Sequence, residues 1–162
     1  MASMTGADYI EVFTRESAHS GAPDRLMLPD WREDDWRNLL SSTTVRAFKT
    51  SDVVIQRGVD DRALYLVADG VLEVGVTTFD GVSVSSLARI GMASVIGEQS
   101  FFDGQPRSAN VWAVTDGTLL RWEFDQYMRF GAAHPELARD FLFAVARILS
   151  TRLRLTTIRV RR

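Results

Sequence analysis

The chain has 162 residues, of which 46% are hydrophobic and 25% charged, and its formal net charge is -2. A chain of this length buries one substantial core, and its nearly balanced charge excludes a broad positive field for nucleic acid or an anionic membrane. The absence of cysteine excludes disulfide frameworks and thiolate metal sites, and it favours a reducing compartment, so we expect a cytoplasmic protein.

The N-terminal 40 residues predict a tail and two small packing helices. Residues 1–6 resemble the start of an expression tag and carry no functional argument. Apolar residues predict a short helix between 7 and 20, and Pro29-Asp30 offers a start for a second helix over 31–40. No apolar run reaches the roughly eighteen residues of a membrane span, so we expect no membrane insertion.

Residues 45–123 are typical of a strand-rich roll within a predicted domain over 41–162. Short segments rich in Val, Ile and Leu alternate with Gly, Asp and Thr turns. Asp-Gly pairs at 69–70, 80–81 and 116–117 favour tight hairpins. We expect a mainly β fold, an eight-stranded jelly roll flanked by helices, with strands at 45–49, 53–56, 64–68, 71–77, 82–90, 95–96, 110–114 and 118–123.

The C-terminal part, residues 124–162, predicts helices over 124–131 and 135–162. The second would extend about 40 Å at a rise of 1.5 Å per residue, which is more than a roll of this size needs for coverage. Its apolar residues form two stripes, which favours the chain's own roll on one side and a homodimer partner on the other. The alternative is a single buried helix in a monomer. The predicted partner seam consists of Phe141, Ala144, Ile148, Thr151, Leu155 and Ile158.

The segment 96–111 contains more than a hairpin needs. It reads Gly97-Glu98 and then, nine residues after Glu98, Arg107 within Pro-Arg-Ser-Ala-Asn-Val. Glycine permits close backbone approach to a ligand, and a helical turn beginning near Glu98 would direct N–H groups outward. The two charged residues could instead form a structural ion pair on the surface.

These motifs resemble the phosphate-binding cassette of cyclic-nucleotide-binding domains, and the resemblance covers roughly residues 40–160. The family's chemistry implies that Arg107 pairs with the cyclic phosphate, aided by Ser108 and backbone N–H groups, and that Glu98 accepts from the ribose 2′-hydroxyl. Gln99-Ser100 departs from the more apolar pair of many relatives, which could loosen the turn. The implied ligand-binding residues in the cassette are Ile96, Gly97, Glu98, Gln99, Ser100, Arg107, Ser108 and Ala109.

The chain is especially similar to the catabolite activators of this family. That similarity implies cAMP as ligand, with cGMP possible, and it aligns Thr156 and Thr157 with helix hydroxyls that reach the base. No DNA-binding segment follows the predicted helix, so we expect no direct DNA contact. We interpret the basic end, from Arg152 to Arg162, as a solvated helix terminus.

The expected function is that of a regulatory sensor domain, possessing no enzyme activity of its own and acting on an effector protein. The alternative is a dimerising scaffold of the same fold that binds no cyclic nucleotide and acts through protein contacts. A metal-dependent roll enzyme is disfavoured because it needs several strand-borne histidines, whereas the sequence contains two, His19 and His134, on predicted helices or loops. We interpret Asp60-Asp61 as a solvated acidic pair.

Overall fold

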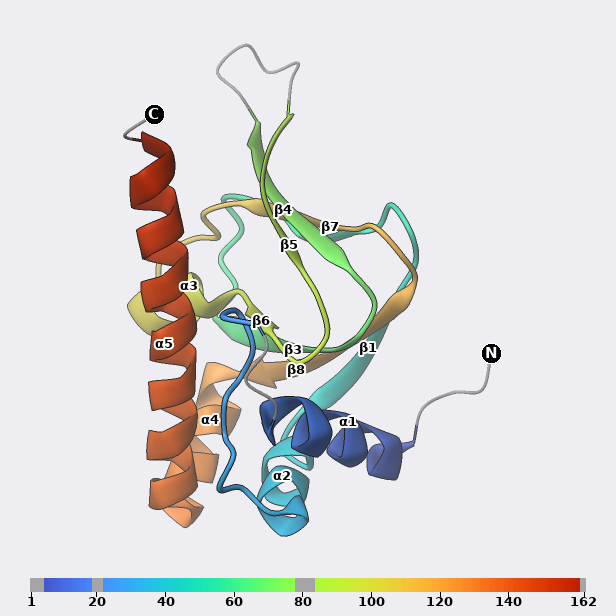
Figure 1. Cartoon of the computed structure of the whole chain (residues 1–162), viewed down its shortest axis with the longest axis vertical. Helices are drawn as coiled ribbons and strands as arrows, with labels where there is room; N and C mark the ends of the chain where they lie inside the picture. The colour runs from blue at the N-terminus through green and yellow to red at the C-terminus, as the bar shows by residue number, and fades with distance from the viewer. Residues whose placement is uncertain (1–4, 19–21, 78–83, 161–162) are drawn as a thin grey trace. The chain divides into compact units, whose positions relative to one another are not determined.

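The computed structural model describes residues 5–18, 22–77 and 84–160, and the chain divides into two compact units (Figure 1). One unit comprises residues 1–42 and 125–162, and the other comprises residues 43–124. The helices of both chain ends therefore fall almost entirely in the first unit, and the strands fall in the second. The turn predicted at 80–81 lies outside the described residues.

The helical unit confirms the helices predicted near both ends of the chain. Its elements are α1 (Gly6–Ala18), α2 (Glu33–Leu40), α5 (Pro135–Val160) and α4 (Phe124–Ala133), whose first residue belongs to the other unit. Helix α2 starts two residues later than predicted, because Arg32 is its N-cap and donates its backbone N–H to the Asp35 carboxylate at 2.9 Å. Stacked aromatic rings join α1 to α2, with the ring centroids of Phe13 and Trp36 5.2 Å apart.

The basic end of α5 is not simply a solvated terminus, as the sequence suggested. Arg152 donates from Nε to the Asp24 carboxylate at 2.9 Å, and only 22% of its side chain is exposed. The pairing was missed because Asp24 lies 128 residues earlier in the chain. Arg152 therefore joins α5 to the segment that follows α1.

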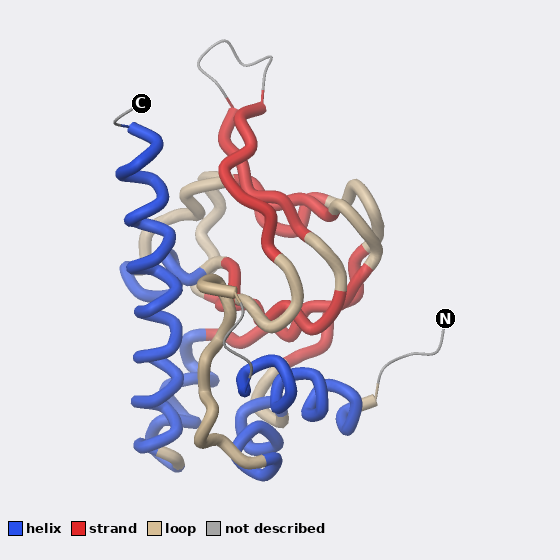
Figure 2. Tube along the Cα trace, in the orientation of Figure 1, coloured by secondary structure: helices blue, strands red, loops and turns tan. Residues whose placement is uncertain are grey.

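The second unit confirms the predicted jelly roll. Its described residues form two four-stranded antiparallel sheets, visible as two red layers in Figure 2. The strand order is β1-β8-β3-β6 in one sheet and β2-β7-β4-β5 in the other. The strands are β1 (Thr44–Phe48), β2 (Val53–Ile55), β3 (Ala63–Asp69), β4 (Leu72–Thr77), β5 (Val84–Ile90), β6 (Val95–Ile96), β7 (Asn110–Ala113) and β8 (Gly117–Glu123).

Both sheets contribute one set of alternate side chains to a common core. Because side chains of a strand alternate between its two faces, each sheet buries every second residue against the other. The buried cluster contains Phe48, Val54, Ile55, Ala63, Tyr65, Val67, Leu72, Ile90, Ile96, Val111, Ala113 and Leu119. In β8 the same inward face continues from Leu119 to Arg121, which brings a charged residue to one end of this core.

The two described Asp-Gly turns do not close hairpins, contrary to the sequence prediction. Each connects strands of different sheets, β3 to β4 at Gly70 and β7 to β8 at Gly117. Gly70 has φ +90°, and a Cβ there would lie 2.7 Å from the Asp116 carbonyl oxygen, so the two turns pack against each other. These glycines serve close approach between crossing segments, since Asp-Gly specifies a tight turn but not the pairing of the strands.

The Asp116 side chain ties its turn to the β1–β2 connection. Its carboxylate accepts hydrogen bonds from the Thr50 backbone N–H at 2.8 Å and hydroxyl at 3.0 Å, and it accepts another from Lys49 Nζ at 3.0 Å. The Thr50 backbone hydrogen bond is the largest cause that lowers the pKa of Asp116 to about 2. The crossing turn is thus held by its own aspartate as well as by the glycine contact.

The two halves of the partner seam predicted along α5 differ in solvent exposure. Phe141, Ala144 and Ile148 are buried within the single chain, whereas Leu155 and Ile158 are 52% and 55% exposed. The first half of the seam is therefore already covered. Only its C-terminal half offers apolar surface to a second molecule.

Candidate functional site

The cassette segment connects β6 to β7 through a short helix, α3 (Glu98–Asp103). Gly97 is the N-cap of this helix and has φ +78°, and Gly104 ends it with φ +68°. Both values lie in the left-handed region that glycine adopts without strain. The two glycines therefore set where the helical turn, predicted from Glu98 onward, begins and ends.

Arg107 is buried, with 3% of its surface exposed, although it follows an exposed loop. Its NH2 group donates to the Ala63 carbonyl at 2.7 Å and to Asp61 Oδ2 at 2.8 Å, and NH1 donates to the Gly97 carbonyl at 2.9 Å. The Nε–H is also buried, and no acceptor for it lies among the residues that the structure describes. A buried donor without a partner is costly, so this atom marks a position where an added acceptor would stabilise the site.

Gly97 and Arg107 are packed so closely that no side chain fits between them. A Cβ built on Gly97 would collide with the Arg107 guanidinium and would lie 2.9 Å from the Ala63 carbonyl oxygen. The predicted close approach at Gly97 is therefore to this arginine. The same glycine begins α3 and leaves the space in which the guanidinium is held.

Glu98, the first residue of α3, is only 6% exposed. Burial of a carboxylate is unfavourable unless polar neighbours compensate it, and a position at the start of a helix favours negative charge. Both residues lie beside Gly97: Glu98 follows it in the sequence, and Arg107 donates a hydrogen bond to its carbonyl. The alternative of a solvated surface ion pair between them does not fit, since both side chains are buried.

The other predicted site residues differ in their surroundings. Ile96 belongs to the core cluster and Ser100 is buried in α3, whereas Gln99 and Ser108 are exposed and Ala109 is half-buried. Ser100 does not prevent the turn from forming, because its carbonyl accepts the Gly104 N–H at 3.0 Å.

Thr156 and Thr157 belong to the helical unit and are exposed on α5. Their hydroxyls donate to the carbonyls of Arg152 and Leu153, at 3.0 and 2.9 Å, within the same helix. Their predicted contact with the base stays a prediction.

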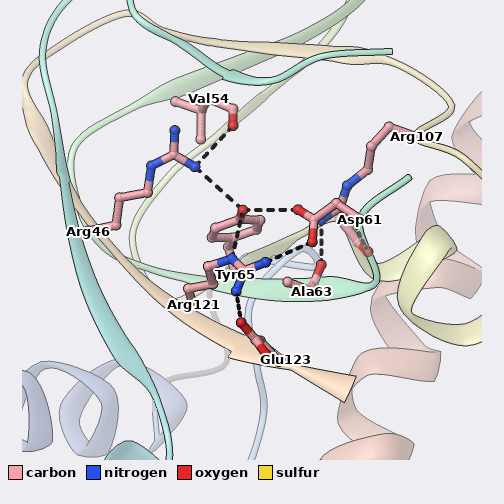
Figure 3. Close-up of polar contacts among 9 residues, drawn as sticks. Arg46, Val54, Asp61, Ala63, Tyr65, Arg107, Arg121 and Glu123 are labelled. Atoms are coloured by element: carbon pink, nitrogen blue, oxygen red, sulfur yellow. Dashed lines mark hydrogen bonds and ion pairs between the residues drawn. The ribbon is translucent and has the colours of Figure 1, made fainter. Parts of the chain in front are cut away.

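The sequence interpretation missed the group of polar residues that surrounds Arg107 (Figure 3). Asp61, interpreted as solvated, is 24% exposed and bridges Arg107 to Arg121, at 2.8 and 2.9 Å. Tyr65, directly opposite Arg121 in the β3–β8 register, donates its hydroxyl to Asp61 at 3.2 Å. Only the strand register reveals this pairing, so no local sequence signal could have found it.

A second missed residue, Arg62, fastens the end of α3. Its Nε donates to the Phe101 carbonyl at 3.0 Å, and its guanidinium lies 3.5 Å from the centroid of the Phe124 ring. The Phe101 ring also meets Phe124 edge to face, with 5.5 Å between centroids. The cation–π contact and the aromatic contact together hold the cassette helix against Phe124, the residue that follows β8.

Across residues 5–18, 22–77 and 84–160, no three histidine, aspartate or glutamate side chains gather as a metal site would require. In the same ranges, no helix combines the length and apolarity of a membrane span.

Comparisons with known proteins show which family this roll belongs to. Residues 45–134 match the family model described as cyclic nucleotide-binding domain. A solved cyclic nucleotide-binding domain from Methylobacillus flagellatus shares the fold with a TM-score of 0.80 and 23% identity, over 97% of this chain and 85% of that one. The catabolite activator protein of Thermus thermophilus aligns with a TM-score of 0.68 and 27% identity, over 89% of this chain and 61% of that one.

A curated relative is much longer than the matched region. Glutaminase 2 of Bradyrhizobium diazoefficiens is 27% identical over 139 residues, which are 86% of this chain but 21% of that protein. The family model covers more than half of the chain, including both glycines of α3 and Arg107. The chain therefore belongs to the cyclic nucleotide-binding domain family.

Proposed function

We propose that the roll binds a cyclic nucleotide, with cAMP preferred over cGMP, and that the chain acts as a regulatory sensor. The observation that carries the proposal is the buried Nε–H of Arg107, which finds no acceptor among the described residues and lies in the family's phosphate-binding segment. A phosphate oxygen is the acceptor that such a guanidinium binds best. The cAMP preference rests on the similarity of Arg107-Ser108-Ala109 to the catabolite activators.

Different cassette residues would bind different parts of the ligand. Arg107 would hold the cyclic phosphate, together with Ser108 and backbone N–H groups that follow Gly97. Glu98 would accept a hydrogen bond from the ribose 2′-hydroxyl, because it is a buried acidic side chain beside that cradle. None of these groups breaks a bond in the ligand, so the proposed role is recognition and not catalysis.

The regulatory step requires an element that responds to the ligand. Thr156 and Thr157 would supply it by binding the base in only one arrangement of α5, since a ligand shifts an equilibrium only through different affinities for its two states. The downstream partner would be an effector protein. We expect this role in the cytoplasm, in agreement with the cysteine-free sequence.

A thermal-shift experiment tests ligand binding directly. We expect cAMP at a hundred times its Kd to stabilise the folded protein by about 2.7 kcal/mol, which raises the melting temperature by roughly 5–10 °C for a chain of this size. 5′-AMP serves as control, because it keeps the base and ribose but lacks the cyclic phosphodiester. Melting temperatures that stay unchanged with both cAMP and cGMP would contradict the proposal, and a larger shift with cGMP would contradict only the stated preference.

We also propose that α5 pairs with a second copy of the chain through its C-terminal turns. Leu155 and Ile158 are more than half exposed and lie three residues apart, so they share one side of the helix. Burial of such apolar surface between two copies is the favourable term that would hold the dimer.

The substitution Leu155→Asp tests this contact. We expect a dimer for the unsubstituted chain and a monomer for the variant, because a carboxylate would be buried in an apolar interface. Leu153→Asp is the matched control: Leu153 is 68% exposed but two positions away, hence on the opposite side of the helix. Light scattering after size exclusion gives the mass, and a monomer before any substitution would rule the dimer out.

A further inference from the structure

One carboxylate, that of Asp61, is shared by two arginines at the polar end of the roll interior. Oδ2 accepts from Arg107 NH2 at 2.8 Å, and Oδ1 accepts from Arg121 NH2 at 2.9 Å. The two arginines thus bind different oxygens of the same group (Figure 3). We call Asp61, Arg107 and Arg121 the charge triad.

Tyr65 forms hydrogen bonds with two members of the charge triad. Its hydroxyl donates to Asp61 Oδ2 at 3.2 Å and accepts from Arg121 Nε at 3.3 Å and from Arg46 NH1 at 3.4 Å. The guanidinium carbons of Arg107 and Arg121 lie 5.7 and 6.0 Å from the centre of its ring. Because Tyr65 is 2% exposed, the triad rests on a buried residue of the core.

The pKa shifts of Asp61 and Arg121 both favour the charged forms of these side chains. Partial burial disfavours ionised Asp61, but hydrogen bonds and charges from Arg107 and Arg121 outweigh it and lower the pKa of the carboxyl below its usual range. Burial likewise opposes charged Arg121, yet its contacts with Tyr65, Glu123 and Asp61 raise the pKa of its guanidinium. The contacts within the triad therefore stabilise the charged forms of Asp61 and Arg121.

The triad consequently has one positive charge more than an isolated Arg107–Asp61 pair would have. Glu123 also pairs with Arg121, but its side chain is 55% exposed, so water and salt screen it more than they screen Asp61. Arg46 adds a further cation near Tyr65.

We infer that Arg121 is a positioning residue for the proposed ligand: by binding Oδ1 of Asp61, it shares that carboxylate with Arg107, which stays oriented and only partly neutralised toward the cyclic phosphate. This inference rests on the proposed function. Arg121 acts on the ligand through Asp61 and needs no contact with it. Without Arg121, both carboxylate oxygens would be available to Arg107, and a monoanionic phosphate would face a neutral ion pair.

A double-mutant cycle measured by calorimetry with cAMP tests the inference. We expect Arg121→Gln to weaken binding about tenfold, and Arg121→Lys, which retains the charge, to weaken it less. In an Asp61→Asn background, the added Arg121→Gln substitution should change affinity by less than about twofold, because the carboxylate it restrains is gone. Arg89→Gln is the control, since it removes the same charge from a 67% exposed arginine of the same roll.

The outcomes separate the inference from the function on which it rests. Equal losses from Arg121→Gln in both backgrounds would show that Arg121 acts independently of Asp61, and they would overturn the inference, as would unchanged affinity in Arg121→Gln. If the unsubstituted chain binds neither cAMP nor cGMP, the proposed function itself fails. A melting temperature taken for each variant without ligand identifies any affinity loss that comes from unfolding.

Discussion

Replacement of Arg107 by alanine is expected to weaken cAMP binding by about 2–5 kcal/mol, or roughly thirtyfold and more, because a desolvated phosphate would lose its charged partner. The guanidinium is 3% exposed and three of its N–H groups already bind the protein, so it is held in place before the ligand arrives. Binding to a preorganised donor costs little ordering entropy. Isothermal titration calorimetry measures the loss.

The same substitution also removes contacts that stabilise the fold, since Asp61, Ala63 and Gly97 each lose a donor. Arg107→Lys separates the two effects: it keeps the charge but loses the planar fork, so we expect affinity between that of the unsubstituted chain and that of the alanine variant. Arg89→Ala controls for the removal of an exposed arginine. Affinity that stays unchanged in a folded Arg107→Ala variant would refute the assigned role.

Gly97→Ala should lower both stability and affinity. The residue has φ +78°, a conformation that costs an alanine about 1–2 kcal/mol, and its new Cβ would collide with Arg107 and approach the Ala63 carbonyl to 2.9 Å. The guanidinium cannot easily move away, because three hydrogen bonds hold it. We expect affinity for cAMP to fall at least about tenfold, as the phosphate-binding group is displaced.

Gly58→Ala is the matched control for this experiment. Gly58 has φ +84°, yet no atom lies within 4 Å of a Cβ built there, so this variant measures backbone strain alone. Chemical denaturation should show a greater stability loss for Gly97→Ala, and calorimetry should show near-normal affinity for Gly58→Ala. Equal stability losses with equal affinities would mean that the contact between Gly97 and Arg107 has no consequence.

Secondary structure was largely predictable because its signals are local. Short apolar segments separated by turn residues predicted the eight strands to within one or two residues at their described ends, and apolar residues sharing a helical face predicted the helices at both ends of the chain. The cassette was predictable for the same reason. Its two glycines, Glu98 and Arg107 lie within eleven residues, and their chemistry and spacing can be read without knowledge of the remaining fold.

The sequence by itself determined the eight-stranded roll, the long terminal helix and the cassette that carries Arg107. Only the tertiary structure decided that Asp61, 46 residues before Arg107, pairs with it, that Arg121 lies opposite Tyr65, and that the two described Asp-Gly turns cross between sheets. It also decided which half of the α5 seam is buried. The physical reason is that local patterns specify how a segment folds, whereas strand order and register specify which distant charges meet.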